Sequence, residues 1–440
     1  MDNLLEYSMV VFLYAGLISY LVFALFYMRR YFLSFDIIMT CVMLVGFLFV
    51  FENLGSEKNL SILLLYILFA ASFLIAYNIR SLAQQNNISV SNNGQYNYKF
   101  LGRVSLAVLC FAALLWSFYI FKIGGLYSLL AVSKMGRSVL TRELSIGYLT
   151  VSESFILITY TIFLVLAFEK RKPFYYLVVT VTFALLGFLA FVNISRGQLV
   201  ALFIIPTVIW AAYSKKRITA IIIFVCISLA ILGIGFKESM ADLHKKAVGG
   251  YAVLELSAYQ NHLTIERIAH PYSQQYYILK DILAYYDLFP SSEKYGLGLL
   301  KSAFIRTIPF IDAPSISTLY VQTFFPQTYE KGGGRGFSLL GEFFLNFNIF
   351  GVVLLGFFLG KITRWLYIKS FYAKDPLYIA IYSFVYPSAF GLLQASSTTI
   401  MNSLILYKVL PLLLVFGLAK RKFINIHIKK YPLEIIHETV

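Results

Sequence analysis

Long apolar runs separated by short polar links make up most of this chain. Eleven runs are visible, most of them close to the roughly 18 residues that a helix needs to cross a bilayer. The pattern predicts an all-α, polytopic transmembrane helical bundle that forms a single integral-membrane domain over residues 1–440. The predicted spans are Met9–Tyr27, Asp36–Val50, Leu60–Tyr77, Val104–Phe121, Tyr148–Phe168, Phe174–Val192, Leu199–Tyr213, Ile218–Phe236, Ser338–Gly360, Leu377–Leu393 and Ser403–Ala419.

Two links are long enough to hold structure of their own. Lys237–Phe337 is the one long hydrophilic segment, and we expect it to form a large loop region outside the membrane within the same domain. Gly124–Gly147 has a mixed composition with several basic residues. If either segment contains a further membrane helix, the number of spans rises from about eleven to twelve or more.

Clusters of Lys and Arg between the runs orient the predicted bundle. With eleven spans, six clusters fall on one side, which the positive-inside rule assigns to the cytoplasm. The N-terminus, Lys237–Phe337 and the polar link Gln394–Asn402 then face outside, and the C-terminus is cytoplasmic. The six clusters are Arg29–Arg30, the Arg80/Lys99/Arg103 group, Lys170–Lys172, Lys215–Arg217, the Lys361/Arg364/Lys369 group and Lys420–Lys422.

Composition supports the membrane assignment and excludes other classes. The chain is 59% hydrophobic and only 13% charged, which no soluble globular class matches. Its net charge of +16 lies mainly in the topological clusters, so we expect no nucleic-acid partner. Cys41, Cys110 and Cys226 all fall in apolar runs, without the spacing of a metal site or a disulfide framework.

A glycine-rich stretch leads into the ninth predicted span. Four glycines lie within Lys331–Gly336 and allow the backbone a positive φ and a close approach to a ligand. Arg335 and Glu342 are seven residues apart, so they would share a face if the helix starts that early. A carboxylate at the start of an apolar membrane helix is costly unless it has an interaction partner or a functional role. Glu342 is therefore a candidate general base, an orienting carboxylate or the ion-pair partner of an arginine.

Several arginines lie on the predicted outer side, against the usual charge bias. The guanidinium fork suits phosphate and carboxylate oxygens, so we expect these arginines to bind an anionic group such as a lipid diphosphate. The alternative is that each arginine reaches lipid phosphate or pairs with a nearby acid. The main candidates are Arg196, Arg306 and Arg335, and Arg137 and Arg142 are weaker members of the group.

The long segment adds histidines and tyrosines. His244, His262 and His270 do not match a zinc-binding spacing, so we expect no metal. His262 is a candidate acid or base, with a structural role as the alternative. The many tyrosines of this segment suit either sugar rings or a membrane interface. No P-loop, Rossmann fingerprint or nucleophile elbow is visible, so no cofactor is expected and the substrate or a gradient must supply the energy.

The layout resembles a known family. The features that carry the likeness are the spans, the late outer segment, Ser195-Arg196-Gly197, and Gly332–Gly336 leading into Ser338–Phe347. In these the chain is similar to the bacterial O-antigen or oligosaccharide repeat-unit polymerases (Wzy type). The resemblance implies a GT-C-like fold and a multi-pass glycosyltransferase of the bacterial inner membrane. Such an enzyme joins undecaprenyl-diphosphate-linked repeat units at the periplasmic face, among membrane lipid and beside a chain-length-regulating membrane protein.

The resemblance also implies roles for the arginines. Arg196 and Arg335 would stabilise the departing diphosphate, and Arg306 would support them. Two other functions stay open: an O-antigen ligase that uses the same donor with a lipid A-core acceptor, and a transporter or flippase for the lipid-linked oligosaccharide. A transporter should show charged or broken helices near the middle of the membrane and paired repeats, whereas the candidate charges here gather at the outer edge.

Overall fold

The computed structural model describes part of the chain. The described residues are all in helices, turns or short links, with one isolated bridge between Tyr96 and Lys420 and no named strand. The prediction of an all-α protein is confirmed for these residues. They are 2–24, 34–52, 59–79, 96–125, 144, 147–192, 196–214, 276–305, 315–330, 337–392 and 395–420.

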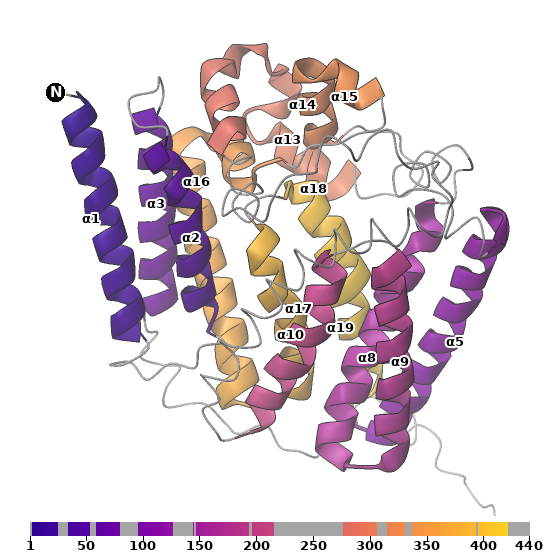
Figure 1. Ribbon diagram of the computed structural model, residues 1–440. Helices are drawn as coiled ribbons and strands as arrows, with labels where there is room; N and C mark the ends of the chain where they lie inside the picture. The colour runs from indigo at the N-terminus through magenta and orange to yellow at the C-terminus, as the bar shows by residue number, and fades with distance from the viewer. Residues whose placement is uncertain are drawn as a thin grey trace, which may run out of the picture.

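The long helices lie side by side (Figure 1). Their bounds are α1 Asp2–Val22, α2 Phe35–Glu52, α3 Asn59–Asn78, α5 Tyr98–Lys122, α8 Val151–Lys170, α9 Pro173–Val192, α10 Arg196–Tyr213, α16 Leu339–Tyr367, α17 Pro376–Leu392, and α18 Ser397–Ile400 with its continuation η8 Met401–Val409 and α19 Leu410–Leu418. Short helical turns lie at η2 Gly147–Thr150 and η7 Ile368–Tyr372.

Six helical stretches among the described residues are long and apolar enough to cross a membrane, and the chain is a polytopic membrane protein. Shorter apolar helices cover Val11–Val22, Phe35–Leu44 and Gln198–Tyr213. The eighth predicted span, Ile218–Phe236, lies outside the described residues, and the predicted total of eleven spans stays a prediction. The six stretches are Asn59–Asn78, Tyr98–Lys122, Val151–Lys170, Pro173–Ala190, Leu339–Tyr372 and Ser397–Leu418.

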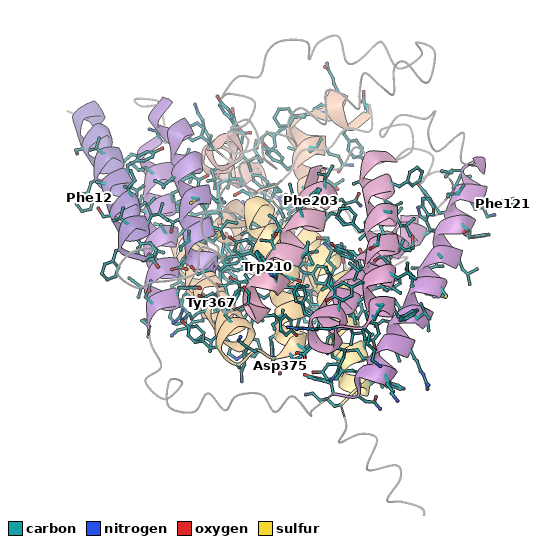
Figure 2. The ribbon with its side chains drawn as sticks, turned by 60° about the horizontal axis from the view of Figure 1, so that its bottom comes forward. Phe12, Phe121, Phe203, Trp210, Tyr367 and Asp375 are labelled. Atoms are coloured by element: carbon teal, nitrogen blue, oxygen red, sulfur yellow. The ribbon has the colours of Figure 1, made fainter. Side chains whose placement is uncertain are left out.

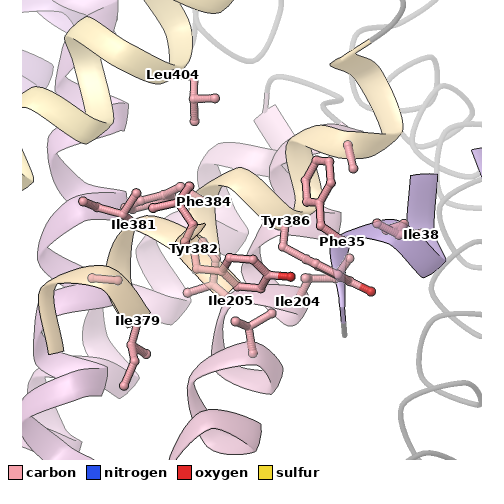
Figure 3. Packing of buried hydrophobic residues seen from close by; sticks show 14 of the residues in the cluster. Phe35, Ile38, Ile204, Ile205, Ile379, Ile381, Tyr382, Phe384, Tyr386 and Leu404 are labelled. Atoms are coloured by element: carbon pink, nitrogen blue, oxygen red, sulfur yellow. The ribbon is translucent and has the colours of Figure 1, made fainter. Parts of the chain in front are cut away.

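Helix α17 lies inside the bundle and organises its apolar core. Its buried residues Ile379, Tyr382 and Tyr386 belong to a cluster with Phe35 of α2 and Ile205 of α10 (Figure 3). Helices α8, α16 and α19 also contact α17. The sequence of α17 is apolar on all sides, which is what a helix surrounded by other helices requires.

The described part of the long hydrophilic segment folds as a group of short helices at one end of the bundle (Figure 1). Its aromatic core includes Phe289, Tyr320 and Phe337, and the Tyr320 hydroxyl donates a hydrogen bond of 2.6 Å to Asp281. Tertiary packing, rather than a long apolar period, holds these short elements. They are a helix over 276–284, η4 Tyr286–Leu288, η5 Ser291–Glu293, α13 Leu297–Leu300, η6 Lys301–Ile305, α14 Ile316–Phe324 and α15 Pro326–Glu330.

The other end of the bundle is tied by Tyr96. Its backbone pairs with Lys420, and its hydroxyl donates to Asp375 Oδ1 over 3.1 Å. Figure 2 shows Asp375 at this end. Burial, together with the nearby Asp375 carboxylate, raises the pKa of Tyr96 well above its ordinary value, so the hydroxyl keeps its proton and remains a donor. The start of α5 and the end of α19 are thereby joined.

Basic side chains gather at this same end. Lys170 Nζ, at the end of α8, lies 4.3 Å from the centre of the Tyr98 ring at the start of α5. The Arg364 guanidinium, near the end of α16, lies 5.4 Å from the centre of the Tyr77 ring of α3. Residues of several predicted basic clusters therefore share one end of the described bundle, and we call it the basic end.

Helices α16 and α3 pack closely through two glycines spaced four residues apart. A Cβ added to Gly356 would lie 2.7 Å from the Phe69 carbonyl oxygen and would also collide with the Ser72 hydroxyl. A Cβ added to Gly360 would lie 2.5 Å from the Phe73 carbonyl oxygen. Both obstacles include backbone atoms, which cannot move aside as the end of a side chain can. Small residues at this spacing let membrane helices approach closely.

We expect Gly360→Val to disrupt this contact. The added methyl groups would have to displace the α3 backbone, and overpacking of this kind costs about 1–3 kcal/mol or more. The variant should lose its monodisperse peak in size-exclusion chromatography or unfold at a lower temperature in detergent. Gly417→Val is the matched control, because no described atom lies within 4 Å of a Cβ at Gly417. Equal thermal stability of the two variants would contradict the close-packing argument.

Candidate functional site

The structure describes one predicted site residue completely and a second one in part. Glu342 is described with its side chain, and it is fully buried in the first turn of α16. For Arg196 the backbone is described: it is the first residue of α10, whereas the sequence predicted a position in the link between two spans. The other five candidates lie outside the described residues: Arg137, Arg142, His262, Arg306 and Arg335.

The start of α16 is set by a serine cap. The Ser338 backbone is extended, and its hydroxyl accepts a hydrogen bond of 3.2 Å from the Gly341 backbone N–H. This arrangement satisfies one of the free N–H groups at the start of a helix. Because α16 begins at Leu339, Arg335 precedes the helix. The condition under which Arg335 and Glu342 would share a helical face is therefore not met.

Glu342 binds the start of another helix. Its Oε1 accepts a hydrogen bond of 2.6 Å from Ser397 Oγ, and its Oε2 accepts one of 2.7 Å from the Ser397 backbone N–H. Ser397 is the first residue of α18, so the carboxylate lies where the helix dipole favours negative charge. Hydrogen bonds to a carboxylate are stronger than those between neutral groups. The pair joins α16 to α18 across 55 positions of the chain.

The location of Ser397 corrects one prediction. The sequence analysis treated Gln394–Asn402 as a polar turn, but α18 starts within it, at Ser397. The hydroxyl of Ser396 caps this helix and accepts a hydrogen bond of 3.3 Å from the Thr399 backbone N–H. The run Ser396-Ser397-Thr398-Thr399 ahead of an apolar stretch is a typical helix-start signal, and it could have located the helix.

Two further polar side chains are buried close to this pair in the chain. Asn346 lies one turn after Glu342 and donates from Nδ2 to the Glu342 backbone carbonyl over 2.8 Å. Among the described residues, neither Asn346 Oδ1 nor Thr398 Oγ1 has a hydrogen-bond partner, although both atoms are buried. Buried polar atoms without partners are uncommon in folded proteins and call for an explanation. Sequence reasoning did not single out Ser397, Asn346 or Thr398.

A backbone break lies just beyond these residues. Asn348 has φ 55° and ψ −149°, which no α-helical residue adopts, so α16 consists of an outer part, Leu339–Phe347, and an inner part from Ile349. A positive φ is uncommon for any residue other than glycine. A Cβ on Gly351 would collide with the Phe343 carbonyl and lie 2.8 Å from Phe347 Cβ, so a glycine is required next to the break. Glu342 and Asn346 are both on the outer part.

A second polar pair joins α8 to α10. Gln198 Nε2 donates to Glu153 Oε2 over 2.5 Å, and both residues lie in the first turn of their helices. Helix α8 ends with Lys170 at the basic end, so its first turn lies at the opposite end, as the first turn of α16 does (Figure 1). Arg196 is two residues before Gln198. The end opposite the basic end thus carries both polar pairs, and we call it the polar end.

Comparison with known proteins assigns the chain to a family. The profile of the family described as O-antigen polysaccharide polymerase Wzy matches residues 4–423. The chain belongs to this family. The resemblance that the sequence indicated is therefore confirmed. No curated protein and no solved structure matches the chain.

Membership of the Wzy family gives the chain its general activity. It is a glycosyltransferase-like polymerase that acts on lipid-linked oligosaccharide repeat units in the membrane. The match runs through all six candidate spans and through both polar pairs, so the polar end belongs to the part of the chain that the Wzy family shares. The match does not favour the ligase or the transporter alternative.

We expect Glu342→Ala to destabilise the protein. The substitution leaves the Ser397 backbone N–H and hydroxyl without their acceptor, and an unsatisfied buried group costs about 1–3 kcal/mol. Thermal unfolding of the detergent-purified variant should therefore occur at a lower temperature. Glu342→Gln keeps one acceptor oxygen, so its unfolding temperature should lie between those of Glu342→Ala and the parent protein. The control is Glu330→Ala at an exposed position of α15; an equal unfolding temperature for E342A and E330A would contradict a structural role for the pair.

Proposed function

We propose that the protein joins undecaprenyl-diphosphate-linked oligosaccharide repeat units at the periplasmic face of the bacterial inner membrane. The observation that carries this proposal is the match of the Wzy family over residues 4–423. The two polar pairs at the end opposite the basic end agree with it, because a reaction between lipid-linked sugars needs polar groups near a membrane surface. A chain-length-regulating membrane protein is a proposed partner.

Charge supports the proposed orientation. The basic end carries Lys170 and Arg364 within the described bundle, and Lys361 lies one turn before Arg364. Positive residues next to spanning helices favour the cytoplasmic side. The end with Glu342 and Ser397 would then face the periplasm. This is the side on which repeat units are available for polymerisation in the proposed reaction.

The proposed reaction needs no nucleotide. The growing glycan leaves its polyprenyl diphosphate, as the bond between its anomeric carbon and the diphosphate oxygen breaks. A hydroxyl oxygen at the non-reducing end of the incoming unit forms the new bond and loses its proton to a base, for which His262 is the candidate. The diphosphate departs with additional negative charge. Stabilisation of that charge is the main contribution expected of the protein.

Arginines are the proposed source of this stabilisation. Arg196 and Arg335 are the main candidates, Arg306 supports them, and Arg137 and Arg142 are proposed to bind the diphosphate or the glycan. Two sequence relations support Arg335 and Arg306. Arg335 precedes the α16 cap Ser338 by three residues, and Arg306 directly follows η6, which contacts α18. Both therefore adjoin, in the chain, elements that meet around Glu342 and Ser397.

Glu342 fits a positioning role better than that of a general base. Its side chain is fully buried, and both of its carboxylate oxygens accept hydrogen bonds from Ser397. A general base must lie within hydrogen-bond reach of a substrate hydroxyl. We therefore propose that Glu342 holds the start of α18 against the outer part of α16, next to the substrate. The general-base alternative requires the pair with Ser397 to open.

Arg196→Ala and Arg335→Ala should each abolish long glycan chains while membrane insertion is retained. The reason is that the departing diphosphate loses a charge that stabilises it, while the apolar spans are unchanged. Gel analysis of cell-surface glycan should show a single-repeat product. Lys172→Ala, at an exposed position of the basic end, should leave the chain-length distribution unchanged. Normal chain lengths in both arginine variants would refute their proposed role.

The activity itself is tested with purified components. Protein in liposomes is incubated with lipid-linked repeat units and no nucleotide sugar. A ladder of longer lipid-linked products is the expected result. Transfer only to added lipid A-core would identify a ligase, and movement across the bilayer without product would identify a transporter. Either of these two results would refute the polymerase proposal.

A further inference from the structure

Helix α13 and its continuation η6 carry an exposed apolar face. Together they form nine helical residues, Leu297–Ile305. Leu297, Leu300 and Phe304 are 50%, 56% and 67% exposed, and their spacing of three and four residues places them on one side. Gly298 is on the buried side, where a Cβ would lie 2.7 Å from the Glu293 carbonyl oxygen. One side of the helix Leu297–Ile305 thus packs against the protein, and the opposite, exposed side is apolar.

Two lysines described near this face are turned back onto the protein. Lys301 Nζ lies 3.3 Å from Glu293 Oε1, and Glu293 is itself buried. Lys294 Nζ lies 4.4 Å from the centre of the Tyr286 ring. Tyr295, just ahead of α13, is 72% exposed. An exposed tyrosine beside an apolar helix face is typical of the boundary between lipid and water.

The apolar face continues onto a membrane-crossing helix. Helix α13 contacts α16, and a Cβ on Gly296 would lie only 3.1 Å from the Phe347 ring. Gly296 has φ +82°, so a glycine is needed there both for the backbone and for this close approach. Phe347, Ile349 and Phe350 of α16 are all exposed. They belong to a candidate spanning helix, Leu339–Tyr372. The exposed apolar side chains of a helix that crosses a bilayer face lipid.

We propose that the face formed by Leu297, Leu300 and Phe304 is immersed in bilayer hydrocarbon beside α16. Helices with one apolar side lie in the membrane interface in this way. The continuity with the lipid-facing side of α16 favours lipid over a protein partner, because one bilayer can cover both surfaces at once. The immersion concerns a segment that the apolar pattern of the sequence assigned to the large hydrophilic loop. Which leaflet holds this face depends on the orientation given under the proposed function. The immersion itself does not depend on that orientation.

Immersion has a consequence for the polar end. Helix η6 contacts α18, and α18 begins with Ser397, which binds Glu342. A lipid-immersed element therefore touches the helix that is joined to the candidate site. The hydrocarbon of a lipid-linked substrate can approach this site along the same face without leaving the bilayer.

Spin labels at single cysteines test the proposal. Cys41, Cys110 and Cys226 are replaced by serine, and Leu300→Cys is labelled in the full-length protein in lipid nanodiscs. Collisions of the label with molecular oxygen and with a water-soluble nickel chelate are compared. Phe350→Cys on α16 is the lipid-exposed control, and Gln327→Cys at an exposed position of α15 is the water-exposed control. The expected result is an oxygen-to-nickel accessibility ratio at Leu300 that resembles Phe350 and clearly exceeds Gln327.

Two results would overturn the proposal. A ratio at Leu300 equal to that at Gln327 would place the face in water. An immobilised label with low access to both reagents would show that protein covers it, and dipolar broadening would identify a second copy of the chain. Leu297→Cys is a second reporter on the same face if Leu300→Cys does not yield folded protein. The measurement needs no substrate, so it is independent of the polymerase assay.

Discussion

The close contact between α16 and α3 is the constraint on which the rest of the described structure depends. In a bilayer there is no hydrophobic driving force between helices, because lipid tails are as apolar as the side chains. Membrane helices therefore associate through close packing and polar contacts. Gly356 and Gly360 allow α16 to reach the α3 backbone. This contact fixes a helix that connects the two ends of the bundle: Glu342 is in its first turn, and Arg364 is near its last turn.

The sequence predicted most of the long helices because their apolar runs are a local property. The predicted start of the ninth span at Ser338 agrees with the observed cap, and the second predicted span, Asp36–Val50, lies within α2. The short elements between 276 and 330 could not be predicted in this way, because contacts such as that of Tyr320 with Asp281 hold them together. The break at Asn348 was also missed, since no glycine or proline occupies that position.

The site was predictable only in part. A carboxylate at the start of an apolar run is unusual, so Glu342 could be selected from the sequence. Its partner Ser397 is 55 positions away, and a pairing at this distance requires tertiary structure. The family, in contrast, could be inferred, because it is a property of the whole layout: the match covers residues 4–423. The predicted arginine and histidine roles remain predictions.

The irregular backbone at Asn348 divides α16 mechanically. Residues from Ile349 onward include the two glycines that pack against α3, whereas Leu345 and Glu342, before the break, contact the short helices and α18. Because Asn348 is not helical, the two parts of α16 are not one continuous helix, and each part is held by its own contacts. Glu342 stays bonded to Ser397 at the start of α18, so the direction of the part before the break is set by this polar pair rather than by the glycine contact with α3.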